Sequence, residues 1–73
     1  MSTITMPNGF KYRISSIRRY IVVVWRPGVA TWTGEYRTDV ESRALARWRH
    51  EARICDRAHV IDAHAEGGPA VIR

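Results

Sequence analysis

The sequence predicts an α+β fold, with one amphipathic helix packed on one face of a three- or four-stranded sheet in the chain order (β)ββαβ. Three observations predict it. Residues 20–25 are all β-branched or aromatic, 30–37 alternates apolar and polar residues, and 39–56 repeats apolar residues with a helical period. Since 73 residues suffice for one small core, we expect a single domain with loose ends at 1–9 and 67–73.

The strands before the helix are expected in three places. Phe10 to Ile14 alternates apolar and polar side chains, which predicts a short first strand. The stretch 20–25 is the clearest strand, and Arg26-Pro27-Gly28-Val29 after it is typical of a turn that leads into a partner strand over 30–37. A symmetric turn pairs Val23 with Trp32, whereas a turn of odd length would shift this register.

The symmetric register defines two faces of this hairpin. The face expected under the helix is apolar, with Gly34 leaving room for a close approach; it holds Ile21, Val23, Trp25, Trp32 and Tyr36. The outer face has apolar residues where a solvated sheet should be polar, so it predicts a protein interface made of Tyr20, Val22, Val24, Thr31 and Thr33. Three alternatives remain for what covers this outer face: the N-terminal strand with Phe10, Tyr12 and Ile14, a second copy in a homodimer, or a host protein.

The helix is expected over 39–56, because Thr38 and Glu41 have the spacing of a capping box. Its apolar arc comprises Ala44, Leu45, Trp48, Ala52 and Cys55. The opposite arc has no carboxylate, although an ordinary exposed helix mixes both signs of charge. This basic arc predicts an anionic partner that contacts Arg43, Arg47, Arg49, His50, Arg53 and Arg57.

After the helix, 58–65 alternates again and predicts a last strand, which Gly67-Gly68-Pro69 ends. A right-handed crossover would place this strand parallel to 20–25, on the free side of the hairpin. Residues 70–73 are expected to be a loose tail or a strand in a partner.

The net charge of +5 favours nucleic acid or an acidic protein surface as the partner. Lys11 is the only lysine among 12 basic residues, so an Arg-biased genome would explain the residue type but not its clustering. We expect no cofactor and no metal, because Cys55, His59 and His64 lack the closely repeated spacing of a zinc site. No enzyme is expected either, since Gly-rich phosphate loops and nucleophile elbows are absent from the sequence.

The expected location is the cytoplasm, which is that of the host cell if a phage encodes the chain. No apolar run approaches the length of a membrane span. The N-terminal residues lack the pattern of a signal peptide, and a single cysteine excludes an intrachain disulfide. We therefore expect no membrane partner.

Two resemblances follow from the residues. The segment from Phe10 to Arg57, with YIVVVW at 20–25 and TWTGEYRT at 31–38 before the helix, resembles the arm-type DNA-binding domains of tyrosine recombinases. That resemblance implies a sheet in the major groove with the helix behind it, whereas here the arginines are on the helix and a strand follows it. In its length, its Arg bias and its Tyr-Arg-Thr segment before an Arg- and Ala-rich helix, the whole chain is similar to small accessory proteins of actinobacterial phages, some of which bind host proteins.

Two functions are therefore expected. The first is a small non-catalytic module that contacts nucleic acid through the basic arc, as a monomer or a homodimer. The second is a protein-interaction module, such as a phage-encoded modulator of a host protein, that acts through the outer sheet face.

Overall fold

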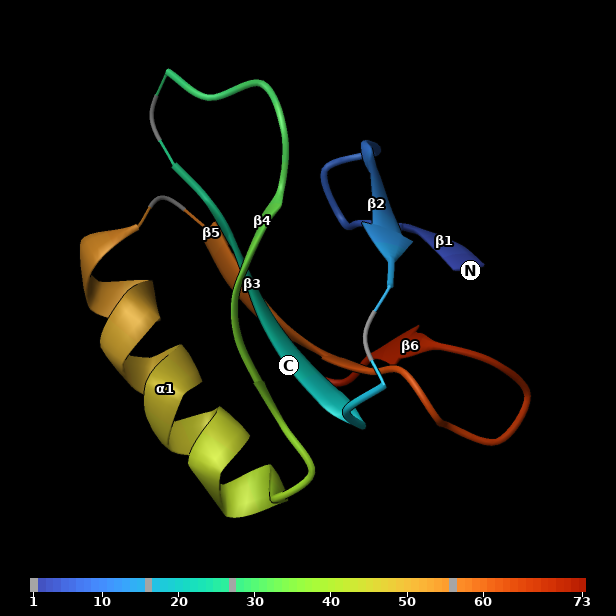
Figure 1. Cartoon of the computed structure of the whole chain (residues 1–73). Helices are drawn as coiled ribbons and strands as arrows, with labels where there is room; N and C mark the ends of the chain where they lie inside the picture. The colour runs from blue at the N-terminus through green and yellow to red at the C-terminus, as the bar shows by residue number, and fades with distance from the viewer. Residues whose placement is uncertain (1, 16, 27, 56) are drawn as a thin grey trace.

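The computed structural model of the chain describes residues 2–15, 17–26, 28–55 and 57–73. It confirms the α+β class: within these residues, strands form two antiparallel sheets and one helix packs on a sheet face (Figure 1). A two-stranded sheet has the order β1-β2, and a four-stranded sheet has the order β4-β3-β5-β6. The elements are β1 (Ser2–Thr5), β2 (Lys11–Ile14), β3 (Tyr20–Trp25), β4 (Thr33–Thr38), α1 (Glu41–Ile54), β5 (Arg57–Asp62) and β6 (Ala70–Val71).

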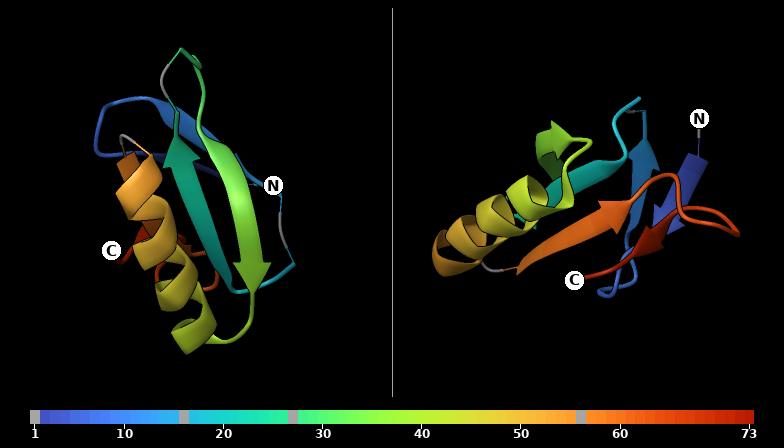
Figure 2. Two further views of the ribbon diagram at one scale, coloured as in Figure 1. Left: turned by 90° about the vertical axis from the view of Figure 1, so that its left-hand side faces the viewer. Right: turned by 90° about the horizontal axis from the view of Figure 1, so that it is seen from below.

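The four-stranded sheet is the middle layer. Helix α1 covers one face and the β1–β2 hairpin covers the other, as the right-hand view of Figure 2 shows. On the helix face, Tyr20 and Val22 pack with Ala44 and Val60. On the hairpin face, the core comprises Met6, Tyr12, Ile14, Ile21, Val23, Trp32 and Ile61. Both faces of the sheet are therefore buried.

The two faces of β3 are reversed relative to the prediction, whereas Tyr36 on β4 packs on the helix side as predicted. Tyr20, Val22 and Val24 are at most 7% exposed, so the predicted protein interface was wrong for these three residues. Tyr20 and Val22 pack under the helix, and Val24 is on the same side of β3 because side chains alternate along a strand. The cause is partly the register: Val23 pairs with Gly34 and not with Trp32, and a bulge interrupts the ladder after Val22. In addition, β3 is apolar on both faces, so its side chains do not indicate which face the helix takes.

Thr31 and Thr33, the other two predicted interface residues, are exposed beside the β3–β4 connection. The turn itself is present in the described part: the Val29 N–H donates to the Arg26 carbonyl at 3.2 Å, and Gly28 has a φ of 77°. Pro27, the remaining residue of the predicted turn, lies outside the described residues.

Residues 2–9 contain a paired strand and a fixed connection, whereas 1–9 was expected to be loose. Strand β1 pairs with β2, and Met6 is only 2% exposed. The Asn8 side chain fixes the connection, because its Oδ1 accepts hydrogen bonds from the Phe10 N–H and the Trp32 indole, both at 3.1 Å. This hairpin supplies the cover that was expected from the N-terminal strand, but on the opposite face of the sheet.

Gly34 makes room for the hairpin and not, as predicted, for the helix. A Cβ atom at this position would lie 2.6 Å from the Tyr12 hydroxyl and 2.8 Å from an Arg37 side-chain nitrogen. A larger residue would therefore have to displace the Tyr12 hydroxyl and the Arg37 guanidinium.

Strand β5 lies beside β3, as predicted, but runs antiparallel to it. The prediction applied the crossover rule to the wrong strand. Helix α1 follows β4 and returns the chain to the end where β4 began, so β5 runs in the direction of β4 and opposite to β3 (Figure 1). The strand ends at Asp62 and not at 65, because the Asp62 carboxylate accepts the His64 N–H at 3.1 Å and forms a turn.

The C-terminal residues also differ from the expected loose tail. Ala70 and Val71 form β6 on the edge of β5, and the Ile72 N–H donates to the Val60 carbonyl at 2.8 Å. The tail therefore adds a fourth strand to the sheet of the same chain.

Helix α1 was expected over 39–56 and spans Glu41–Ile54; position 56 lies outside the described residues. The predicted capping box is absent, since no side chain caps the first turn. Thr38 instead accepts the Val40 N–H at 3.1 Å, and Asp39 accepts the Arg19 N–H at 2.9 Å. These bonds fix the connection between β4 and α1.

The buried arc of α1 is rotated from the predicted one. Ala44 and Glu51 are its buried residues, Leu45 and Trp48 are half-buried, and Ala52 is exposed. The prediction followed apolar residues alone and so placed the arc too far toward Ala52.

Candidate functional site

The structure separates the residues of the predicted basic arc into three environments. Four lie exposed on α1, and they are Arg43, Arg49, His50 and Arg53. Arg47 is half-buried against the sheet. Arg57 is exposed but belongs to β5, because the helix ends at Ile54. We refer to Arg43, Arg49, His50 and Arg53 as the outer face of α1.

Arg47 is held by its own chain. Its Nε donates to Glu51 Oε1 at 2.9 Å, and its guanidinium lies 5.5 Å from the centre of the Tyr36 ring. Burial raises the pKa of Glu51, but the hydrogen bonds from Arg47 and Cys55 and the charge of Arg47 outweigh it, so the pKa lies below its ordinary value. Arg47 is thus needed to neutralise a buried carboxylate.

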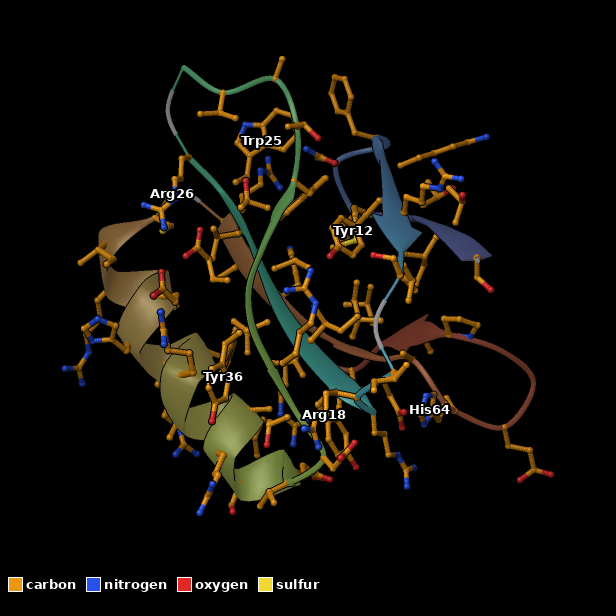
Figure 3. The ribbon with its side chains drawn as sticks, viewed as in Figure 1. Tyr12, Arg18, Trp25, Arg26, Tyr36 and His64 are labelled. Atoms are coloured by element: carbon orange, nitrogen blue, oxygen red, sulfur yellow. The ribbon has the colours of Figure 1, made fainter. Side chains whose placement is uncertain are left out.

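Three other arginines form ion pairs that join separate segments of the chain: Arg18 with Asp39 at 2.9 Å, Arg19 with Asp62 at 3.1 Å and Arg26 with Glu35 at 2.7 Å. The first two pairs fix the segment before β3 to the start of α1 and to the end of β5. The third joins the residue that follows β3 to the third residue of β4. In Figure 3, Arg18 and Arg26 lie at opposite ends of the sheet.

The arginines on the outer face of α1 have a different environment. Among the described residues, no carboxylate pairs with Arg43, Arg49 or Arg53. Glu41 is the only other carboxylate of α1, and at 100° per residue it lies about 160° around the axis from Arg43. The outer face is therefore a concentrated positive surface.

Arg43 also lines a hollow of about 370 Å³ at the junction of β4 and α1. The other lining residues are Arg18, Tyr36, Arg37, Thr38, Asp39 and Val40. Its one carboxylate is already engaged: the hydrogen bond from Arg18, followed by the one from the Arg19 N–H, holds the pKa of Asp39 below its ordinary value. Arg37 lines the same hollow from β4, but its guanidinium lies beside Gly34 on the hairpin side of the sheet and so does not extend the outer face of α1.

Cys55 and His59, two of the residues considered for a metal site, contact other groups of the chain. The part of the chain that the structure describes contains no group of three His, Cys, Asp or Glu side chains able to hold a metal ion. The Cys55 thiol donates to Glu51 Oε2 at 3.5 Å, and burial together with this bond raises its pKa. His59 instead has its Nδ1 2.9 Å from the Arg73 carbonyl oxygen.

Comparison with protein families, curated proteins and solved structures found no match for this chain. The resemblances to recombinase arm domains and to phage accessory proteins therefore stay predictions. Within the described ranges, no helix is long and apolar enough to cross a membrane.

Proposed function

We propose that this chain is a small, non-catalytic cytoplasmic module that binds nucleic acid through the outer face of α1. The observation that supports this proposal is the contrast between arginines on one helix. Arg47 is paired with Glu51, whereas Arg43, Arg49 and Arg53 have no carboxylate partner among the described residues. A guanidinium left without an internal partner is available to a phosphate, which it can bind with two parallel hydrogen bonds.

The dimensions of this face suit a nucleic-acid backbone. Arg43 and Arg53 are ten residues apart, so they are separated by about 15 Å along the helix axis. That length corresponds to about four base-pair steps of a duplex. Contacts of this kind go to phosphates and carry little sequence information, so the proposed binding is non-specific.

The alternative function, a protein-interaction module, no longer has the apolar surface that it was predicted to use. A protein-interaction module was expected to use Tyr20, Val22 and Val24, and all three side chains are buried. Thr31 and Thr33 of that predicted interface remain exposed, but they are polar. The same burial removes the reason for expecting a homodimer through that face.

The test is fluorescence anisotropy with a labelled DNA duplex at increasing salt. Three phosphate contacts predict a slope of about −3 for the logarithm of the binding constant against the logarithm of the salt concentration. Arg49→Glu should weaken binding about tenfold at low salt, since it reverses one contact and offers Arg53 a competing carboxylate four residues away.

Arg73→Glu is the matched control, because it makes the same charge change at an exposed residue outside the helix. It should weaken binding much less than Arg49→Glu. The absence of duplex binding at about 50 mM salt, where phosphate contacts are strong, would overturn the proposal. An equal loss in both variants would also overturn it, because net charge alone would then explain the binding.

A further inference from the structure

A row of aromatic side chains runs from the core to the surface on the hairpin side of the sheet. The ring centres are 5.1 Å apart for Phe10 and Trp25, 5.3 Å for Trp25 and Trp32, and 5.4 Å for Trp32 and His59. Trp32 is 4% exposed, Trp25 is half-buried and Phe10 is 55% exposed. The row therefore ends in a large aromatic ring that faces solvent.

The position of Phe10 is fixed by its neighbours. Its N–H donates to Asn8 Oδ1, and the same oxygen accepts the Trp32 indole N–H. Trp25 packs against Phe10 with the rings tilted by 40°. Phe10 is thus held beside Trp25 with much of its surface open, which is the arrangement needed for a further ring to stack.

Two cations belong to residues next to this ring pair, one across the sheet and one along the chain. Arg57 is directly opposite Trp25 in the β3–β5 ladder, so both side chains are on the same face of the sheet. Lys11 follows Phe10 in the chain and is also exposed. Neither cation has a carboxylate partner in the part of the chain that the structure describes. Figure 3 shows Trp25 at the upper end of the β3–β4 pair, with Arg26 next to it on the helix side.

We propose that Phe10 and Trp25, with Arg57 and Lys11, form a binding site for single-stranded nucleic acid. A base stacks on the open side of Phe10, while the two cations contact the phosphates on either side of it. This inference rests on the proposed function in one respect, because it takes nucleic acid as the class of ligand. The residues that make the contact are different from those of the outer face of α1.

The site selects single strands over duplexes for a physical reason. A base inside a duplex is already stacked on both sides, so it cannot lie on Phe10 without being unpaired. An oligonucleotide without secondary structure presents its bases freely, and aromatic stacking tolerates any base because each has a π-face.

The experiment titrates the full chain with an oligothymidylate of about eight nucleotides and records both anisotropy and tryptophan fluorescence. Binding should quench the fluorescence of the chain, because the base lies against the Phe10–Trp25 pair. Trp25→Phe should remove most of the quenching and keep the anisotropy change, since a phenyl ring still supports the stack. An oligouridylate in a parallel titration shows whether RNA or DNA is the preferred strand.

Phe10→Ala should weaken oligothymidylate binding about tenfold and leave duplex binding unchanged. Phe10→Tyr should keep the wild-type affinity, and a urea unfolding curve of each variant confirms that it is folded. Ile17→Ala is the matched control, because Ile17 is 87% exposed and precedes β3, whereas Trp25 ends that strand. It should change neither binding constant.

Equal binding by the wild type, Phe10→Ala and Ile17→Ala would overturn the stacking site, as would binding without quenching. The two proposals fail separately. If Phe10→Ala has no effect while Arg49→Glu weakens duplex binding, the stacking site is wrong and the function of the α1 face stands. If Phe10→Ala weakens oligothymidylate binding and Arg49→Glu has no effect on duplex binding, the stacking site stands and the α1 face is wrong.

Discussion

The arginines of this chain occupy two kinds of environment, although their side chains are identical. At the ends of the strands and on the inner side of α1, four of them bind carboxylates of other segments or of the helix: Arg18, Arg19, Arg26 and Arg47. On the outer side of α1, Arg43, Arg49 and Arg53 have no such partner among the residues that the structure describes. The first group contributes to the fold and the second is open to a partner.

Arg47 and Arg49 make this contrast sharpest, because they are two residues apart on one helix. Arg47 lies above Tyr36 and reaches Glu51 one turn later, whereas Arg49 lies on the exposed side. Residues that are four apart on a helix are neighbours, and residues that are two apart lie on different faces. The position on the helix, and not the residue type, therefore decides which arginine is structural.

The largest effect is expected when an ion pair of the first group of arginines is removed. Arg47→Met keeps the length of the side chain but leaves the carboxylate of Glu51, which is 3% exposed, without its cation. Loss of one partner of a buried pair costs about 3–5 kcal/mol, and because Arg47 is partly solvated we expect a loss of about 2 kcal/mol in the free energy of unfolding. Arg49→Met should change it by less than about 0.5 kcal/mol.

Urea unfolding of the two variants measures this difference directly. The pair is matched in residue type, helix and substitution, so helix propensity contributes equally to both. Equal destabilisation would contradict the assignment of Arg47 as structural.

A smaller effect is expected in the way that the loss of unfolding free energy in Arg47→Met depends on pH. In the wild type, the lowered pKa of Glu51 contributes stability above its ordinary value of 4.5, and this contribution is lost as the pH falls through the folded-state value. In Arg47→Met the burial of Glu51 dominates and raises its pKa, so the folded variant favours the neutral acid and gains relative stability as the pH falls.

The difference in unfolding free energy between the wild type and Arg47→Met should therefore narrow from about pH 7 to about pH 4. The lowered pKa of Asp62, which comes first from its hydrogen bond with Arg19, acts equally in both proteins and cancels in the difference. A difference that stays constant over this range would show that Arg47 acts through packing and not through the charge of Glu51.

The central strands and the helix were predicted, whereas β1, β6 and the arrangement of the elements were not. Strand β3 begins and ends where the pattern indicated, and α1 begins two residues later than predicted and ends at Ile54. Local propensity and periodicity carry that information. The reversal of the two sheet faces could not be predicted, because Val22, Val23 and Val24 present the same apolar surface to both sides.

The site could be predicted in part. The helical period placed Arg43, Arg49 and Arg53 on the exposed side, and the structure places them there. The sequence has a glutamate four residues after Arg47, a spacing that predicts an ion pair, but Glu51 lies beside the basic arc and not on it, so the arc alone did not indicate the pair. The contact between Phe10 and Trp25 depends on how the hairpin packs on the sheet, and no local pattern contains that information.

The smallest expected effect compares one arginine of each group in nucleic-acid binding. Arg53→Gln removes a contact of the outer face, and it should reduce the slope of the logarithm of the duplex binding constant against the logarithm of the salt concentration by about 0.9. Arg26→Gln should leave the slope unchanged, because the Arg26 guanidinium lies 2.7 Å from Glu35 and releases no counterion from DNA. Both variants lower the net charge by one, so the slope separates a local contact from a general attraction. Equal slopes for the two variants would mean that the charge of the whole molecule, and not the outer face of α1, attracts nucleic acid.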